Sequence, residues 1–161
     1  MTVSRTLNIN VAFDCTHDAN ANTFGGTASY AQAGSTPDMG NVVDGDGTIH
    51  LDRAAAFDPG VYSQNVDIYF HLATPAIVMP DGVNTPVEWA TLYGQGMHIT
   101  VPEGGSSSEF HVQAVAGQPN LILIKDNDDD SNTYNYKPAV ELPDHGHYYI
   151  SLDPKIVNKP A

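Results

Sequence analysis

The sequence predicts an all-β fold, a single antiparallel β-sandwich of Greek-key or jelly-roll type over residues 1–161 with little or no helix. Three observations predict this class. Apolar and polar residues alternate with a period of two in several segments, which is typical of a strand with one buried face. Turn sequences separate these segments at intervals of about 8–12 residues. The sequence lacks a convincing 3.6-residue apolar period, which a helix would show.

The alternation is clearest in residues 7–13 and 66–72. Leu7, Ile9, Val11 and Phe13 share one side of the first segment, and the even-numbered residues of the second segment are all apolar. Residues 17–47 are rich in Gly, Asn, Ser and Ala, and we expect a long excursion with one short strand there. Further strands are expected at residues 48–51, 87–92, 98–101, 110–115, 121–125, 134–140, 148–152 and 155–157.

The chain is strongly acidic, with 19 Asp and Glu against 6 Lys and Arg and a net charge of -13. Phosphate contacts need clustered Lys and Arg, and neither occurs between Arg53 and Lys125, so nucleic acid is excluded as a partner. Asp outnumbers Glu by 15 to 4. Because Asp favours turns over helices, the charge is expected in the loops. No apolar run approaches the ~18 residues of a membrane-spanning helix.

The cellular compartment is inferred from the cysteine content and the N-terminal residues. Cys15 is the only cysteine, so no disulfide forms within the chain. The first residues lack the apolar run of a secretory signal, which favours a cytoplasmic protein. Export without a signal peptide stays open as an alternative.

The densest acidic segment is residues 126–132. Asp126, Asp128, Asp130 and Asn132 carry the oxygen ligands that calcium prefers, so they are candidate calcium ligands. The segment departs from the EF-hand loop, because Ser131 stands at the sixth position, where that loop has glycine. A solvated hairpin tip that discourages aggregation is the favoured alternative. The expected cofactor is therefore either none or calcium.

A second acidic segment, residues 44–52, is a weaker candidate for a cation site. Asp44 and Asp46 alternate with glycines, and the run resembles the centre of an EF-hand or dockerin loop. Its register is wrong at both ends, where Val42 and Arg53 take the first and the twelfth ligand positions. A hairpin turn before a strand is therefore the favoured interpretation.

An enzymatic function would need either a metal site built from histidines or a recognisable catalytic motif. His145 and His147 would lie on one side of an extended segment, where they could join a transition-metal site. Scattered histidines on a solvated face are the favoured alternative. The sequence has no Gly-x-Ser-x-Gly elbow and no phosphate-binding loop. An enzyme is therefore not expected, and a histidine-based metalloenzyme is kept as the last alternative.

Aromatic residues beside many Asn and Asp are also typical of sugar-binding sites. Trp89 and Tyr93 are the candidate stacking platforms for a carbohydrate. Packing of the same rings across strands is the favoured interpretation. A calcium-assisted, lectin-like carbohydrate-binding module remains the first alternative function.

The C-terminal part resembles a known protein family. The run at residues 121–126, the Tyr134-x-Tyr136 strand and the closing Asp153-Pro154-x-Ile156-Val157 segment resemble bacterial inclusion-body proteins of the PixA/AidA type. The resemblance implies an abundant, non-enzymatic cytosolic protein that can assemble, and it implies no catalytic residues. The leading hypothesis is thus an acidic β-sandwich that assembles with itself or binds a partner, with cations as candidate stabilisers.

Overall fold

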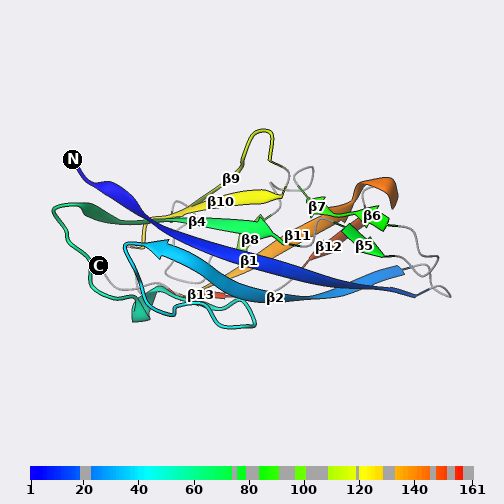
Figure 1. The fold of residues 1–161 in the computed structure, drawn as a ribbon, viewed down its shortest axis with the longest axis horizontal. Coiled ribbons are helices and arrows are strands. Elements are labelled where there is room, and N and C mark those ends of the chain that lie inside the picture. The colour runs from blue at the N-terminus through cyan, green and yellow to red at the C-terminus, as the bar shows by residue number, and fades with distance from the viewer. Residues whose placement is uncertain are drawn as a thin grey trace.

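The computed structural model describes residues 1–18, 23–73, 76–78, 84–90, 97–100, 109–118, 120–128, 133–145, 148–151 and 155–157. Within these residues the chain forms two β-sheets that pack against each other (Figure 1). The prediction of an all-β fold is confirmed. The only helical segments described are two three-residue 3-10 turns, η1 (Leu51–Arg53) and η2 (Pro143–His145).

The first sheet has five strands in the order β2-β1-β4-β10-β9. It comprises β1 (Val3–Asp18), β2 (Thr23–Thr36), β4 (Tyr62–Leu72), β9 (Phe110–Ala114) and β10 (Leu121–Asp126). The strands pair antiparallel except for β1 and β4, so the mostly antiparallel arrangement expected from the sequence includes one parallel pair in this sheet. A parallel pair needs a long crossover, and the chain supplies one through β2 and residues 37–61.

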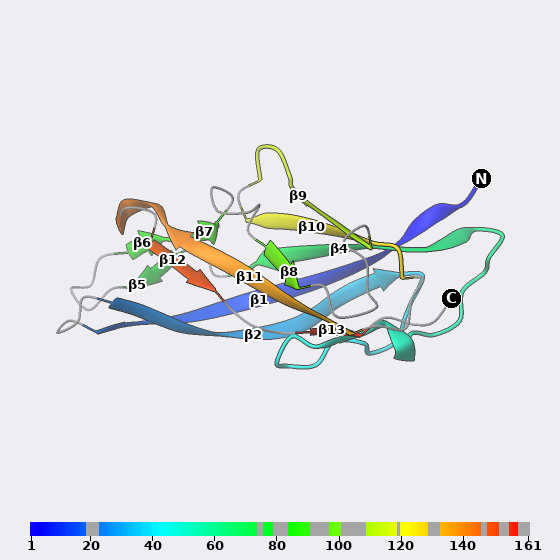
Figure 2. The same cartoon turned by 180° about the vertical axis from the view of Figure 1, so that it is seen from behind.

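The second sheet is built around β11 (Thr133–Leu142), which crosses the molecule in front of the first sheet in Figure 2. Along its length β11 pairs with β7 (Glu88–Trp89), β8 (Met97–Thr100), β12 (Tyr148–Ser151) and β13 (Lys155–Val157). Strand β13 also pairs in parallel with β3 (Ile49–His50). A separate hairpin joins β5 (Ala76–Val78) to β6 (Asn84–Pro86).

The core lies between the sheets and follows the alternation seen in the sequence. The fully buried residues of these two strands include Leu7, Ile9 and Val11 of β1 and Val66, Ile68 and Phe70 of β4. Tyr136 of β11 packs on Phe70, with ring centroids 5.4 Å apart. Fully burying each such side chain contributes about 1.5–3 kcal/mol. A one-residue slip would turn this whole set to solvent, so the alternation fixes the strand register.

Two regions differ from the strands expected from sequence. Strand β2 has 14 residues, although only a short strand was expected between residues 17 and 47. In the part of β2 with described side chains, Tyr30 is the only buried residue. Over residues 28–36 the strand therefore contributes little to the core besides Tyr30 and Ala28, and its backbone pairs with β1. The β5–β6 hairpin was not expected either.

Candidate functional site

Asp126 and Asp128, two of the predicted calcium ligands, lie at the end of β10, and each is only 1% exposed. Ile122, Ile124 and Asp126 alternate on β10, so all three side chains point into the core. Asp128 has a φ of 50°, in the left-handed region, where the chain turns just after the strand. The expectation of a solvated tip is therefore wrong for these two aspartates.

Arg5 on β1 supplies a positive charge to this buried region. Its side chain is 2% exposed, and its Nη2 atom donates to Asp128 Oδ2 at 2.9 Å and to the Gln64 carbonyl oxygen at 2.6 Å. The guanidinium carbon lies 4.3 Å from the centroid of the Phe57 ring, which is a cation–π geometry. A buried ion pair thus joins the first strand to a segment 123 residues further along the chain.

Glu109, just before β9, completes a buried acid cluster with Asp126 and Asp128, and it is 4% exposed. Burial raises the pKa of Asp126 well above its usual value, although the Asp128 N–H, which donates to Asp126 Oδ1 at 2.9 Å, opposes the change. The charges of Asp128 and Glu109 and a hydrogen bond with the Glu109 side chain raise this pKa further. With one proton shared by Asp126 and Glu109, and with Arg5 beside Asp128, the three carboxylates keep a net charge of -1.

The predicted calcium loop is described only in part, since Asp130 and Asn132 lie outside the described residues. Among the residues that are described, no three His, Cys, Asp or Glu side chains converge to hold a metal ion. Within the buried acid cluster, Arg5 is the counter-ion of Asp128. The surroundings of Asp126 raise its pKa, first through burial.

The second acidic segment forms a hairpin turn, as the sequence favoured. The Asp44 N–H donates to the Thr48 carbonyl, and the Gly47 N–H donates to the Asp44 carbonyl, both at 2.9 Å. Gly47 has a φ of 91°, which glycine adopts without steric cost. The Thr48 N–H also donates to Asp46 Oδ1 at 2.9 Å. Residues 44–47 are called the acidic turn below.

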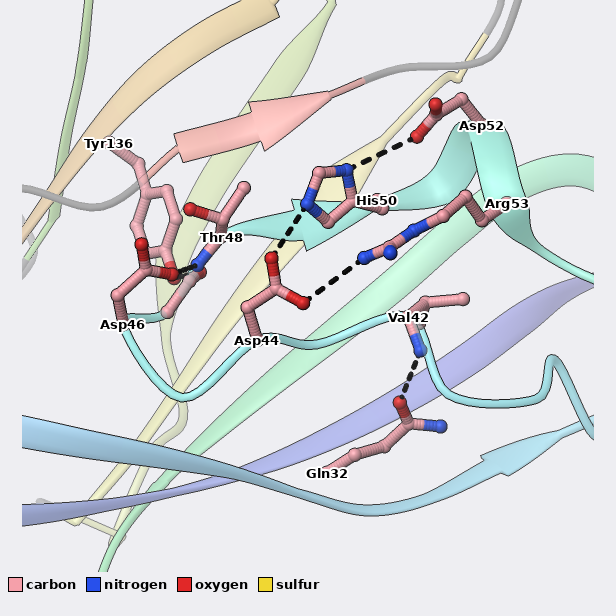
Figure 3. A network of polar contacts seen from close by, with 10 residues as sticks. Gln32, Val42, Asp44, Asp46, Thr48, His50, Asp52, Arg53 and Tyr136 are labelled. Carbon is pink, nitrogen blue, oxygen red and sulfur yellow. Dashed lines mark hydrogen bonds and ion pairs between the residues drawn. The ribbon is translucent and has the colours of Figure 1, made fainter.

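The acidic turn is paired with the side chains of His50 and Arg53, as Figure 3 shows. Asp44 Oδ2 lies 2.9 Å from His50 Nε2, and Asp44 Oδ1 accepts from Arg53 Nη2 at 3.1 Å. The other ring nitrogen of His50 lies 3.6 Å from Asp52. Hydrogen bonds from His50 and Arg53 lower the pKa of Asp44. Both carboxylate oxygens of Asp44 are therefore engaged by protein groups, in a network open to solvent.

Of the remaining predicted site residues, only Trp89 has a described side chain. Trp89 is 1% exposed and pairs with Val140 across β7 and β11, so its ring packs in the core. The prediction of Trp89 as a stacking platform is corrected accordingly, because a sugar needs an accessible ring face. Tyr93 and His147 lie outside the described residues, and for His145 only the backbone is described, at the end of η2.

The β2 edge of the first sheet is covered at Tyr30 and Gln32 by the loop that carries the acidic turn. The Tyr30 N–H donates to the Gly45 carbonyl at 3.2 Å. The Gln32 side chain donates through Nε2 to the Gly40 carbonyl at 2.6 Å, and its Oε1 accepts from the Val42 N–H at 2.9 Å. The Gln32 amide thus makes the two hydrogen bonds that a peptide group of a paired strand would make. Residues 40–45 are held along this edge as a result.

The opposite edge, formed by β9, is called the open edge below. Strand β9 pairs with β10 on one side, and no described segment pairs with its other side (Figure 1). Residues 110–124 contain no Asp, Glu, Lys or Arg. His111 is exposed and Gln113 is half-buried, and both lie on the outer face of the sheet. Sequence analysis placed this strand but missed its edge position, which depends on the strand order.

The outer face of the first sheet carries one half-buried tyrosine, Tyr69 of β4. In the strand register its neighbours are Asn8 of β1 and Leu123 of β10. His71 lies two residues further along β4, and its Nε2 lies 2.9 Å from Asn8 Oδ1. The face therefore combines an aromatic ring with amide and imidazole groups.

Comparisons with known proteins do not assign a family. Neither protein-family models nor curated proteins gave a match to this chain. In the described part of the chain, neither helical turn is long and apolar enough to cross a membrane. The function is therefore inferred from the residues and edges described above.

Proposed function

We propose that this chain is a non-enzymatic protein that associates with itself by pairing strands at the open edge of β9. The observation that carries the proposal is the difference between the two edges of the first sheet, since β2 is covered and β9 has no partner in the described residues. An exposed edge strand presents unpaired N–H and C=O groups and is a template for pairing with another chain. Proteins that remain monomeric usually cover, charge or bend such an edge.

The distribution of charge supports the same edge. With a net charge of -13, two copies repel each other over most of their surfaces. The 15 residues from 110 to 124 carry no charged side chain apart from any protonated His111, so copies that meet there bring no carboxylates face to face. Salt screens the long-range repulsion, because the Debye length falls from about 30 Å at 0.01 M to about 3 Å at 1 M ionic strength. Association is therefore expected to strengthen with salt.

Sedimentation velocity of the full chain tests the proposal directly. The measured mass should rise above the 17.2 kDa of one chain as protein concentration increases, and it should rise at lower concentration in high salt. A monomeric mass over the whole concentration series at both low and high salt would overturn the proposed function.

A calcium-dependent form of this association is a separate proposal with its own test. Asp128 is paired with Arg5, and the raised pKa of Asp126 favours its protonated form, so calcium binding there would have to compete with both. Melting temperature and sedimentation are compared in calcium and in chelator. Higher melting temperature or larger mass in calcium supports a calcium site, and unchanged values reject it.

Carbohydrate binding is the second candidate, and the Tyr69 face favours it over the residues first expected. Tyr69 is half-buried on the outer face of the first sheet, with the Asn8 amide and the His71 ring beside it. Aromatic rings flanked by hydrogen-bonding groups suit sugar recognition. A glycan array of the wild type and Tyr69→Ala, each with and without chelator, tests this candidate. Binding that is lost in Tyr69→Ala supports it, and an array without hits rejects it.

A further inference from the structure

We infer that the assembly is a closed dimer, in which β9 of one copy pairs antiparallel with β9 of a second copy about a two-fold axis at Val112. The inference rests on the proposed function and specifies its partner, register and size. The two five-stranded sheets would join into one continuous sheet of ten strands. Two features of the structure select this arrangement.

The first feature is that the other edge strand of the first sheet, β2, is already contacted at Tyr30 and Gln32 by a loop of the same chain. Pairing of β9 with β2 of the next copy would be a heterologous contact, and repetition of such a contact produces a filament or a ring. The loop at residues 40–45 already accepts the hydrogen bond of the Tyr30 N–H and is fixed by Gln32. Asp44 and Asp46 stand in that loop and would repel an incoming acidic copy. Pairing of β9 with β9 uses the same edge on both copies, so the assembly is complete as a dimer.

The second feature is that β9 is self-complementary in one register. In an antiparallel pair, directly opposite side chains lie on the same face, so the register must keep Phe110, Val112 and Ala114 on the core face. A two-fold axis at Val112 achieves this and pairs all five residues of the strand. Phe110 then faces Ala114 of the second copy, Val112 faces its own equivalent, and His111 faces Gln113. The large Phe110 side chain thus lies opposite the small Ala114 side chain, and the polar His111 lies opposite the polar Gln113.

Charge variants at the two outward-facing positions test the register. His111→Glu with Gln113→Glu places glutamates opposite each other twice across the axis, and like charges directly opposite are destabilising. We expect the dimer dissociation constant to rise at least about tenfold, which corresponds to about 1.4 kcal/mol. His111→Glu with Gln113→Lys instead places opposite charges together across the axis, keeps the glutamate at position 111 opposite Lys125 of β10 and leaves the net charge unchanged. This variant should dimerise at least as tightly as the wild type.

A matched control separates a specific edge from a general effect of charge. Ser29→Glu with Ala31→Glu adds the same two charges to exposed positions on the outer face of β2, at the covered edge. This variant should dimerise like the wild type. Circular dichroism of each variant checks that it folds. For the wild type, hydrogen exchange gives a second measurement, since the amides of β9 should become more protected as concentration rises while those of β4 should not.

The outcomes distinguish failure of the proposed β9 dimer from failure of self-association itself. A wild type of twice 17.2 kDa, with the dimer weakened only by the paired glutamates in β9, supports the inference. A wild type that is monomeric under all conditions overturns the proposed function itself. A wild-type dimer unaffected by the β9 glutamates overturns the β9 site but leaves self-association standing. Equal weakening by the Lys–Glu variant overturns the Val112 register, and masses that grow beyond the dimer overturn the closed assembly.

Discussion

The two acidic regions of the molecule place their carboxylates in opposite environments. In the acidic turn, Asp44 is 48% exposed and is paired with His50 and Arg53, which are also open to solvent. In the buried acid cluster, Asp126 and Asp128 are 1% exposed, and the cation beside them, Arg5, is 2% exposed. The two regions therefore have similar composition but different surroundings.

The comparison shows how surroundings decide what an aspartate does. Water stabilises the exposed carboxylates, so their ion pairs contribute little to folding. A buried carboxylate has lost its hydration and needs either a cation or a proton. Asp128 has Arg5, and the pKa of Asp126 is raised, first by burial. Variants that remove one partner in each region should therefore differ strongly in their effect.

The largest effect is expected for Arg5→Met. This change leaves the Asp128 carboxylate buried without its cation, and breaking a buried pair in this way costs about 3–5 kcal/mol. Urea unfolding measures the loss. The matched control is Arg53→Met, which removes the cation of the exposed pair and should change the free energy of unfolding little. Equal losses in the two variants would show that burial does not distinguish the regions.

The next effect is a pH dependence that Asp126→Asn removes. Because the folded-state pKa of Asp126 is raised, the folded protein binds this proton more tightly than the unfolded chain. The stabilisation from this proton is complete below about pH 4 and is lost as pH rises through the folded pKa, by up to about 1.4 kcal/mol per pH unit. Relative to wild type, Asp126→Asn should therefore gain stability as pH rises.

Unfolding free energies at several pH values between 4 and 8 test this second prediction. Three groups face Asp126 in this region, namely Glu109, Asp128 and Arg5. Asp67→Asn, on the outer face of β4, is the control for loss of one carboxylate. A difference between Asp126→Asn and wild type that stays constant with pH would contradict the shared-proton description.

A smaller loss, about 1–2 kcal/mol, is expected for Tyr136→Phe. The buried Tyr136 hydroxyl donates to the Gly47 carbonyl oxygen, so the acidic turn is anchored to the core through its backbone. Tyr30→Phe is the matched control, because the buried Tyr30 hydroxyl has no hydrogen-bond partner in the described structure. The melting temperature of Tyr136→Phe should be lower than that of Tyr30→Phe. The reverse order would argue against this anchor.

The smallest effect is expected for Asp44→Asn, which should leave the melting temperature close to that of wild type at neutral pH. The Asp44 pKa is lowered by its hydrogen bonds with His50 and Arg53, so its small stabilisation exists above the usual Asp range and is lost as pH falls. The pH dependence of stability that Asp44 contributes is therefore opposite in sign to that of Asp126. Melting curves at neutral and acidic pH measure it, and a large drop at neutral pH would mean that the turn depends on this carboxylate.

Part of the buried acid cluster could be read from the alternation in the sequence. Arg5 continues the odd-numbered inward series of Leu7 and Ile9, and Asp126 continues the even-numbered series of Ile122 and Ile124. A charged residue that extends a core-facing series is a signal for a buried ion. The alternation does not show that Arg5 meets Asp128, because the two residues are 123 positions apart and meet through strand pairing.

By itself, the sequence determined the all-β class, most strand positions and the hairpin turn at residues 44–47. These features depend on local periodicity and on the backbone preferences of Gly and Asp. Only the tertiary structure decided the parallel pairing of β1 with β4, the full length of β2 and the burial of Asp126. It also decided that β2 is covered while β9 has no described partner on its outer edge. The physical reason is that hydrogen bonding and burial of a strand depend on its neighbours in the sheet, which local sequence does not specify.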